Sequence, residues 1–494
     1  MRTQPGHGLR SSEGSLSMFR SLVVLLMIIM AVPVNAQTSR LELGRRLKRF
    51  ELAWEAAAPA DRARCVDPLK VAVTSFFSLN LSEAGRQLDQ AWIAVRGSTA
   101  STLEESVIGL QCLPTPVCAD VSNATLKLQI RPFYGENNST VEVQVQVALQ
   151  DRHGKLLKET AFSLSDLDQP AEWNTGPLPE GDHSLSITCR RDSEQYQLPG
   201  ITISRISDLE SRLASLERAA SALKTAATTD LQRTVAATVR DEGRLIRNLS
   251  EGRLQEADFP ILQRLLFCES LASETAYSSI AAKAAADKSD VWLTLAKGMK
   301  TVRTRLRFPP SNGQPVPVLF VFHGAGGSEN MFFETYGAGG VIQEAAKRGW
   351  MVVSPGQGML GMSLGIADML DALEPFVPID RNRIMVFGHS MGAAQVMTQV
   401  QKHPDLPIAA VALGGGRGMT IKDPPEAPRA AWFVAAGEAD FGRSGARQLH
   451  RSLTAAGITS QYKDYPDVEH LVVVQAAIDD SFRFLDDILS KSSQ

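Results

Sequence analysis

The chain has 494 residues, of which 44% are hydrophobic and 21% are charged, and its formal net charge is -3. This is ordinary globular composition with enough length for two or three domains, which excludes a fibrous or disordered chain. The sequence contains no block of basic residues and only 6% aromatic residues, so no nucleic-acid-binding surface is indicated.

The first residues have the pattern of a secretory signal. Arg20 precedes the apolar run SLVVLLMIIMAVPV, and a small-residue cleavage site follows at Val34-Asn35-Ala36. The run is short for a membrane span and Pro33 interrupts it. We therefore expect residues 1–36 to be a cleaved signal peptide, with Met18 as an alternative start and an uncleaved anchor as the competing interpretation. The protein is then expected to be secreted or periplasmic, with no other membrane contact.

Residues 37–112 have helical spacing. Leu41, Leu47 and Phe50 belong to one apolar pattern, and a second segment opens at Asn80. This part carries no catalytic motif, so we interpret it as a helical N-terminal module.

In residues 120–205 the apolar period changes to two, as at Val143, Val145 and Val147. Half-buried strands separated by turn signals predict a small antiparallel β-sandwich. The stretch LPEGDHSLSITC loosely resembles the last hairpin of immunoglobulin-like or fibronectin-type accessory domains. That resemblance implies a spacer or protein contacts through the N-terminal modules.

Residues 206–298 return to helical composition, which predicts a helical connector. Leucine and alanine residues recur at steps of four and three in a short coiled-coil-like seam. A seam of this length favours packing within the chain, with a dimer contact as the alternative. The seam comprises Leu209, Leu213, Leu216, Ala220 and Leu223.

All five cysteines precede residue 300, and their spacing matches neither a zinc site nor a redox CxxC motif. Export permits disulfides, for which Cys112 with Cys118 and Cys65 with Cys268 are the candidate pairs. Five buried or free thiols are the alternative.

Strands and helices alternate in residues 300–494, which predicts a mostly parallel sheet with helices on both faces. The predicted strands are 302–308, 316–322, 350–354, 384–387, 409–413, 431–435 and 461–465, and the predicted helices are 341–347, 366–373, 447–456 and one ending near 489.

The sequence GHSMG at 388–392 lies between a predicted strand and a predicted helix, as a nucleophile elbow does. Glycines at both flanks leave room for the strained turn that lifts the Ser390 hydroxyl clear of the sheet. We predict Ser390 as the nucleophile. The backbone N–H of Met391, which follows it near the helix N-terminus, is the first predicted oxyanion donor.

A second glycine-rich turn follows the strand at 316–322 in the sequence HGAGG. Its glycines let a backbone N–H point toward the elbow, so the N–H of Ala325 is the second predicted oxyanion donor. We assign Gly324, Gly326 and His389 to the substrate-binding wall. His470 is the predicted base, because it lies in a loop after the last strand and before the C-terminal helix, where an imidazole can reach over the serine.

The order of elements and the motifs HGAGG and GHSMG resemble the α/β-hydrolase superfamily over residues 300–490. With the short GEAD loop, they look like the secreted poly(3-hydroxybutyrate) depolymerase, feruloyl esterase and carboxylesterase group. That resemblance implies an acid in the loop after the strand at 431–435, where Asp440 is favoured over Glu438. It also implies the chain order serine, acid, histidine, which His470 completes. The loop at 355–365 should border the substrate site, because loops at the carboxyl ends of parallel strands line the crevice.

The resulting prediction is a multi-domain chain with a C-terminal α/β-hydrolase that cleaves small-molecule or polymeric carboxylic esters through an acyl-enzyme. Neither a metal-ligand cluster nor a phosphate-binding loop occurs, so no cofactor is expected. A prolyl oligopeptidase-like serine peptidase and a non-catalytic binding or scaffold protein are the alternatives.

Overall fold

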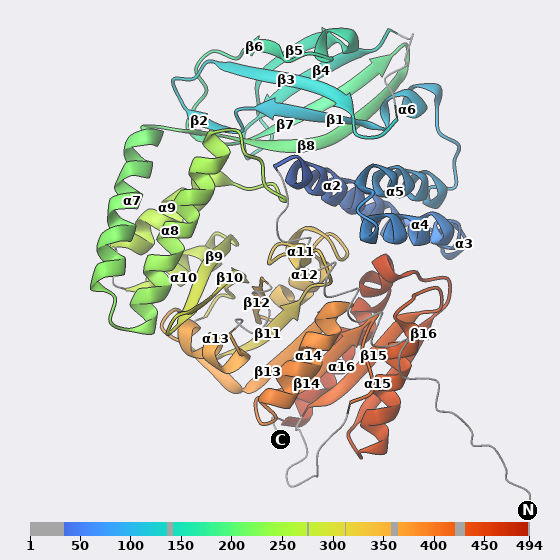
Figure 1. Cartoon of the computed structure of the whole chain (residues 1–494), viewed down its shortest axis with the longest axis vertical. Coiled ribbons are helices and arrows are strands. Elements are labelled where there is room, and N and C mark those ends of the chain that lie inside the picture. Colours follow the sequence, from blue (N-terminus) through green and yellow to red (C-terminus); the bar gives the residue numbers. More distant parts are fainter. Residues whose placement is uncertain are drawn as a thin grey trace, which may run out of the picture.

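The computed structural model of the chain describes residues 34–135, 142–273, 276–311, 313–356, 364–419 and 430–492 (Figure 1). The signal peptide predicted for residues 1–36 therefore lies outside the described residues, except that Val34 opens helix α2 (Val34–Ala56). Most of the predicted pocket loop at 355–365 lies outside them too. Within the described ranges, no helix combines the length and the apolar character that crossing a membrane requires.

An eight-stranded sheet forms the centre of the C-terminal part, in the order β16-β15-β14-β13-β11-β12-β10-β9. Neighbours from β12 through β16 pair in parallel, whereas β9 and β10 pair antiparallel at one edge. The strands are β9 (Asp290–Lys297), β10 (Lys300–Arg307), β11 (Val316–Phe322), β12 (Met351–Pro355), β13 (Ile379–His389), β14 (Pro407–Leu413), β15 (Ala431–Gly437) and β16 (Ser460–Tyr465).

Helices cover both faces of this sheet because its strands are apolar on both sides. Along β11, Val318 and Phe320 belong to one buried cluster, and Leu319 and Val321 to another. The mostly parallel sheet with helices on both faces is therefore confirmed. The helices that follow β10 in the chain are α11 (Met331–Glu334), α12 (Gly340–Lys347), α13 (Ile366–Leu373), α14 (Met391–Lys402), α15 (Arg443–Ala455) and α16 (Val473–Ser492).

The predicted helical connector at 206–298 was wrong in its last residues. Helices α7 (Leu209–Ala226), α8 (Asp230–Ser250), α9 (Ile261–Ser273) and α10 (Tyr277–Ala286) are followed by β9, so the sheet begins before residue 300. Residues 291–296 are all buried, because β9 pairs with β10 and packs against α8. Their apolar run is too short to distinguish a buried strand from a helix by periodicity.

Two smaller sheets pack face to face in the region of the predicted sandwich. One has the order β1-β3-β6 and the other β2-β8-β7-β4-β5, and a single buried cluster holds residues of both. The immunoglobulin-like assignment stays a prediction. The strands are β1 (Leu110–Thr115), β2 (Cys118–Asp120), β3 (Thr125–Pro132), β4 (Gln144–Gln150), β5 (Leu156–Ser163), β6 (Ala171–Asn174), β7 (Gly181–Arg191) and β8 (Glu194–Ile206).

The N-terminal helices share the core of the central sheet. Phe50 and Trp54 of α2 and Leu69 of α4 (Val66–Phe77) belong to the same buried cluster as Leu319 of β11. Figure 1 shows these helices between the smaller sheets and the central sheet. Helices α3 (Pro59–Ala63), α5 (Leu81–Val95) and α6 (Thr102–Val107) complete this part.

The predicted seam of α7 packs within the chain. Leu209, Leu213 and Leu216 are buried in the cluster that also contains Val318 of β11, and α8 is the helix that α7 contacts most. Helices α7 to α10 therefore extend the core on the sheet face opposite α2 and α4.

All five cysteines are buried free thiols, so neither candidate disulfide forms. Cys65 belongs to the cluster of α2 and α4 and Cys268 to the cluster of α7 and α8, which places the two on opposite faces of the sheet. Burial raises the pKa of the Cys112 and Cys118 thiols to about 12, so both remain protonated at neutral pH.

Candidate active site

Ser390 occupies the sharp turn between β13 and α14 that the GHSMG motif predicts. Its φ and ψ are 58° and -118°, a conformation that costs a non-glycine residue energy. A Cβ at Gly392 would lie 1.8 Å from the carbonyl oxygen of Phe322, and one at Gly388 would lie 2.3 Å from that of Gly392. Both flanking glycines are therefore required, because no side chain fits where the strand, turn and helix meet.

Asp440 and His470 form a buried hydrogen-bonded pair. Oδ1 of Asp440 lies 2.7 Å from Nδ1 of His470 and also accepts the N–H of Gly442 at 2.6 Å. Burial by itself would raise the pKa of Asp440, but the hydrogen bond to His470 and the attraction of its ring lower it below its usual value. The carboxylate is therefore ionised and holds Nδ1 of the imidazole in its protonated form, which leaves Nε2 as the acceptor.

Glu438, the competing acid, points elsewhere. Its carboxylate pairs with Arg443 at 3.1 Å on the outer side of the loop. Of the two acidic residues in this loop, Asp440 is the one in contact with His470.

Ser390 and His470 line one large cavity of about 960 Å³. Four other residues of the predicted site lie on the same wall, whereas Met391 does not line the cavity but opens α14 directly after Ser390. The structure thus brings together residues from the ends of β11 and β13 and from the segment after β16. The four are Gly324, Ala325, Gly326 and His389.

The two predicted oxyanion donors are available. Among the residues that the structure describes, neither the N–H of Ala325 nor that of Met391 has a hydrogen-bond acceptor. Met391 is the first residue of α14, where an N–H has no intrahelical partner. The N–H of Gly324 is different, because the hydroxyl of Tyr336 accepts it at 3.0 Å. Gly324 therefore shapes the turn but cannot offer that N–H to a substrate.

His389 lies on the cavity wall but uses both ring nitrogens inside the protein. Nδ1 is 2.9 Å from the hydroxyl of Tyr336, and Nε2 is 3.0 Å from the backbone carbonyl oxygen of His470. Burial and repulsion from the His470 ring lower the pKa of His389 to about 3, so its ring is neutral. Its hydrogen bonds leave it a positioning role and no free group for a substrate.

Three residues of the site carried no signal in the sequence analysis. Tyr336 follows α11 in a glycine-rich segment unrelated to any motif, and Phe76 belongs to a helix interpreted as structural. Phe441 packs at a tilt against the His470 ring, with 4.0 Å between ring centroids, although its side chain is 60% exposed. Of these, only Phe441 could have been suspected from the sequence, since an aromatic residue follows the candidate acid directly.

A metal-dependent arrangement is not found in the described part of the chain. No group of three or more histidine, cysteine, aspartate or glutamate side chains there is placed to hold a metal ion.

Sequence comparison finds no relative, since neither a family model nor a curated protein matches the chain. Solved structures do match in part. The fluorophosphonate-binding serine hydrolase F of Staphylococcus aureus is 15% identical with a TM-score of 0.35, covering 40% of this chain and 98% of its own. A ferulic acid esterase of Anaeromyces mucronatus is also 15% identical, with a TM-score of 0.33. The match covers 40% of this chain and 89% of the esterase.

A third match is a thermostable esterase, 20% identical with a TM-score of 0.34, covering 41% of this chain and 63% of its own. The three are serine hydrolases and esterases of the α/β-hydrolase superfamily. The functional assignment therefore comes from the geometry of the site.

Proposed function

We propose that this chain is a serine hydrolase that cleaves carboxylic esters through an acyl-enzyme. One observation carries the proposal. The Asp440–His470 hydrogen bond of 2.7 Å lies at a cavity whose wall also holds Ser390 on a strained strand-to-helix turn. A nucleophile, a base and a group that orients the base are the three parts that acyl transfer by serine requires.

In the proposed mechanism, Nε2 of His470 takes the Ser390 proton as the hydroxyl oxygen attacks the ester carbonyl. Asp440 keeps the imidazole in the correct tautomer and stabilises its positive charge. The N–H groups of Met391 and Ala325 donate to the oxyanion. His470 then protonates the leaving alcohol, and water activated by the same imidazole hydrolyses the acyl-enzyme.

Two finer assignments belong to the proposal. Cleavage of a polyester such as poly(3-hydroxybutyrate) is one candidate activity within ester hydrolysis. Export after removal of residues 1–36 is the candidate route to such a substrate. Serine peptidase activity is the competing chemistry, because the same groups cleave amides, but the described strands form three sheets and none is a propeller blade array of the prolyl oligopeptidase kind.

The test measures hydrolysis of chromogenic acyl esters, an amide peptide and poly(3-hydroxybutyrate) by the protein lacking residues 1–36. We expect ester turnover that Ser390→Ala and His470→Ala each reduce by about 10⁴ or more. Arg451→Ala, an exposed change on α15 away from the cavity, is the control. A folded wild type that turns over no ester would refute the proposal, and turnover confined to the peptide would assign the site to amide cleavage.

A further inference from the structure

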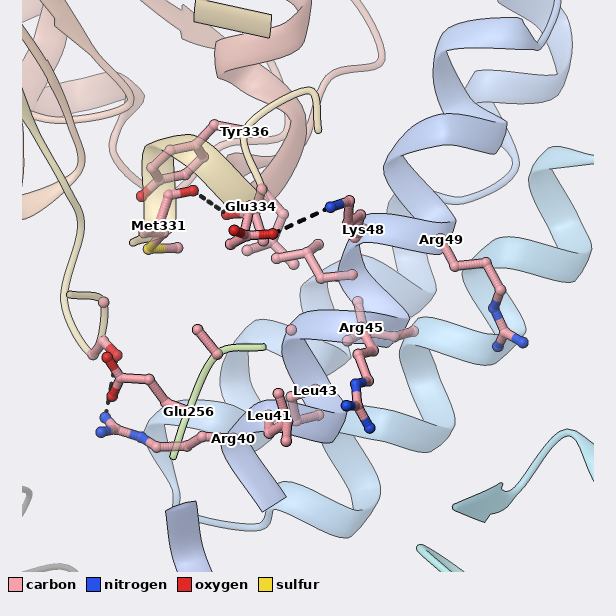
Figure 2. A pocket seen from close by; sticks show the side chains of 18 of the residues that line it. Arg40, Leu41, Leu43, Arg45, Lys48, Arg49, Glu256, Met331, Glu334 and Tyr336 are labelled. Atoms are coloured by element: carbon pink, nitrogen blue, oxygen red, sulfur yellow. Dashed lines mark hydrogen bonds and ion pairs between the residues drawn. The ribbon is translucent and has the colours of Figure 1, made fainter. Parts of the chain in front are cut away.

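Part of the wall of the cavity that Ser390 lines is built by the N-terminal helices. Residues of α2 from Arg40 to Ala53 line it, together with residues of α4 and α5. Figure 2 shows Lys48 of α2 joined to Glu334 of the C-terminal part, with Leu41, Leu43 and Arg45 further along the same helix. The helices that the sequence analysis interpreted as a structural module therefore form half of the candidate site.

These helices contact the turn that follows β11. A Cβ at Gly326, in the turn beside the oxyanion donor Ala325, would lie 2.6 Å from the ring of Phe76 on α4. Arg40 on α2 donates to the carbonyl oxygen of Gly326 at 3.2 Å. Helices α2 and α4 therefore border the cavity at the turn that carries the predicted oxyanion donor.

Helix α4 also contacts the base His470 indirectly, through Phe441. Phe77 of α4 packs edge-on against Phe441 at 6.3 Å between ring centroids, and Phe441 in turn packs at a tilt against the His470 ring. Helix α4 therefore borders the site at both the oxyanion turn and the imidazole.

The N-terminal wall is mainly apolar. Leucine, alanine, valine and aromatic side chains from the three helices face the cavity, and Leu198 and Pro199 of β8 extend the surface. The larger apolar lining side chains of the helices include Leu43, Leu47, Phe76, Phe77 and Trp92.

Most of the cations on this wall are matched by carboxylates of the protein. Lys48 pairs with Glu334 at 3.2 Å, and Arg49 pairs with Asp89. Arg45 lies 3.9 Å from both Glu42 and Asp258. These three charges are already compensated, so they do not call for a charged ligand.

From this geometry we propose that α2, α4 and α5 are the substrate-binding wall, and that the substrate is an uncharged ester with a bulky apolar group. A cavity of about 960 Å³ is large enough to bury a drug-sized ligand, whereas an acetyl group would leave most of its apolar surface uncovered. The apolar group lies along α2, and the ester carbonyl lies at Ser390. A long acyl chain and an aromatic acyl group share this chemistry.

Gly44 offers a direct test of the wall. It lines the cavity from α2, and a Cβ built there has no heavy atom within 4 Å, so a side chain would project into open space. Gly44→Phe should fill part of the cavity without displacing the backbone. Ala56→Phe is the matched control, because it adds a similar ring to the same helix at an exposed position outside the cavity.

The measurement compares kcat/KM for nitrophenyl acetate, dodecanoate and naphthoate esters. We expect the wild type to prefer one or both bulky esters to the acetate. Gly44→Phe should lower the bulky-to-acetate ratio about tenfold, the value of excluding about two methylene groups from apolar surface. Ala56→Phe should leave the ratio unchanged. Dodecanoate against naphthoate distinguishes a chain from a ring, and a ratio unaffected by Gly44→Phe would overturn the proposal.

The inference rests on the proposed ester hydrolysis, so a second readout separates the two. Binding of the uncharged fluorophore N-phenyl-1-naphthylamine to Ser390→Ala protein needs no turnover. Weaker binding in Ser390→Ala/Gly44→Phe than in Ser390→Ala/Ala56→Phe would support the apolar wall even if no ester were cleaved. Equal binding in the two, with matching thermal melts by circular dichroism, would refute the wall independently of catalysis.

Discussion

The hydroxyl of Tyr336 lies 2.9 Å from Nδ1 of His389, and this contact links the oxyanion turn at Gly324 to the backbone of the base His470. The same hydroxyl accepts the N–H of Gly324 at the oxyanion turn, while Nε2 of His389 donates to the carbonyl oxygen of His470. One buried chain of hydrogen bonds therefore runs from the oxyanion turn to the backbone of the base.

Replacing Tyr336 by phenylalanine should cost both stability and activity. The change leaves the N–H of Gly324 and Nδ1 of His389 buried without a partner, at about 1 to 3 kcal/mol for each such group. We expect a lower free energy of unfolding in urea and a lower kcat, because the oxyanion turn and His470 lose a common support. Tyr462→Phe removes a hydroxyl bonded to Asp464 far from the cavity and is the control. Unchanged kcat in Tyr336→Phe would show that the chain of hydrogen bonds does not position the site.

The acid can be assigned by two matched variants. Asp440→Asn should lower kcat by about 10⁴, because an amide in that position favours the wrong imidazole tautomer. Glu438→Gln should leave kcat unchanged, since Glu438 pairs with Arg443 and does not reach His470. Equal losses in both variants, measured with the same ester, would contradict the assignment.

Glu51 predicts a pH dependence of stability. Its buried carboxylate accepts the N–H groups of Tyr336, Gly337 and Ala338, yet burial outweighs these bonds and raises its pKa to about 8. Because the folded state holds the proton more tightly than the unfolded state does, the contribution is complete below about pH 4.5 and is lost as the pH rises through about 8.

We therefore expect the free energy of unfolding to fall between about pH 5 and about pH 8, and Glu51→Gln to reduce that slope. Urea denaturation at several pH values measures both. Glu51→Gln should also lower overall stability, because its NH₂ group faces backbone donors. A slope that Glu51→Gln does not change would exclude Glu51 as its source.

Phe441 should matter for turnover more than for folding. Its exposed ring covers one face of His470, so Phe441→Ala opens the imidazole to water and weakens its attraction to Asp440. We expect a reduced kcat with a stability change within about 0.5 kcal/mol, as for other exposed positions. Phe441→Tyr keeps the ring and should keep the rate. Equal rates for the alanine and tyrosine variants would show that the covering ring has no effect.

Adding a side chain at Gly392 of the elbow should change stability in the opposite direction to adding one at Gly44. Gly392→Ala places a Cβ against the Phe322 carbonyl and should destabilise the fold by several kcal/mol, about 4 or more. Gly44→Ala, in an open helical position, should instead stabilise the protein by about 0.5 to 1 kcal/mol. Thermal melts of the two variants test both signs, and comparable melting temperatures would contradict the steric argument.

The sequence by itself determined the local features of the site. The turn at Ser390 depends on neighbouring glycines, and strand β11 and helix α13 depend on apolar runs within a few residues, so each could be predicted from its own segment. His470 was selected differently, by the chain order serine, acid, histidine of the family that the motifs resemble.

Only the tertiary structure decided the rest. Glu51 contacts Tyr336 across 285 positions of sequence, and Arg40 contacts Gly326 across 286. Contacts at such separations are set by how helices pack on a sheet, which no local pattern encodes. The choice of Asp440 over Glu438, the support from Tyr336 and the apolar wall of α2 all depend on that packing. The turn at Ser390 could be predicted because its conformation depends on neighbouring residues. The pocket around it could not, because it depends on packing between segments far apart in the sequence.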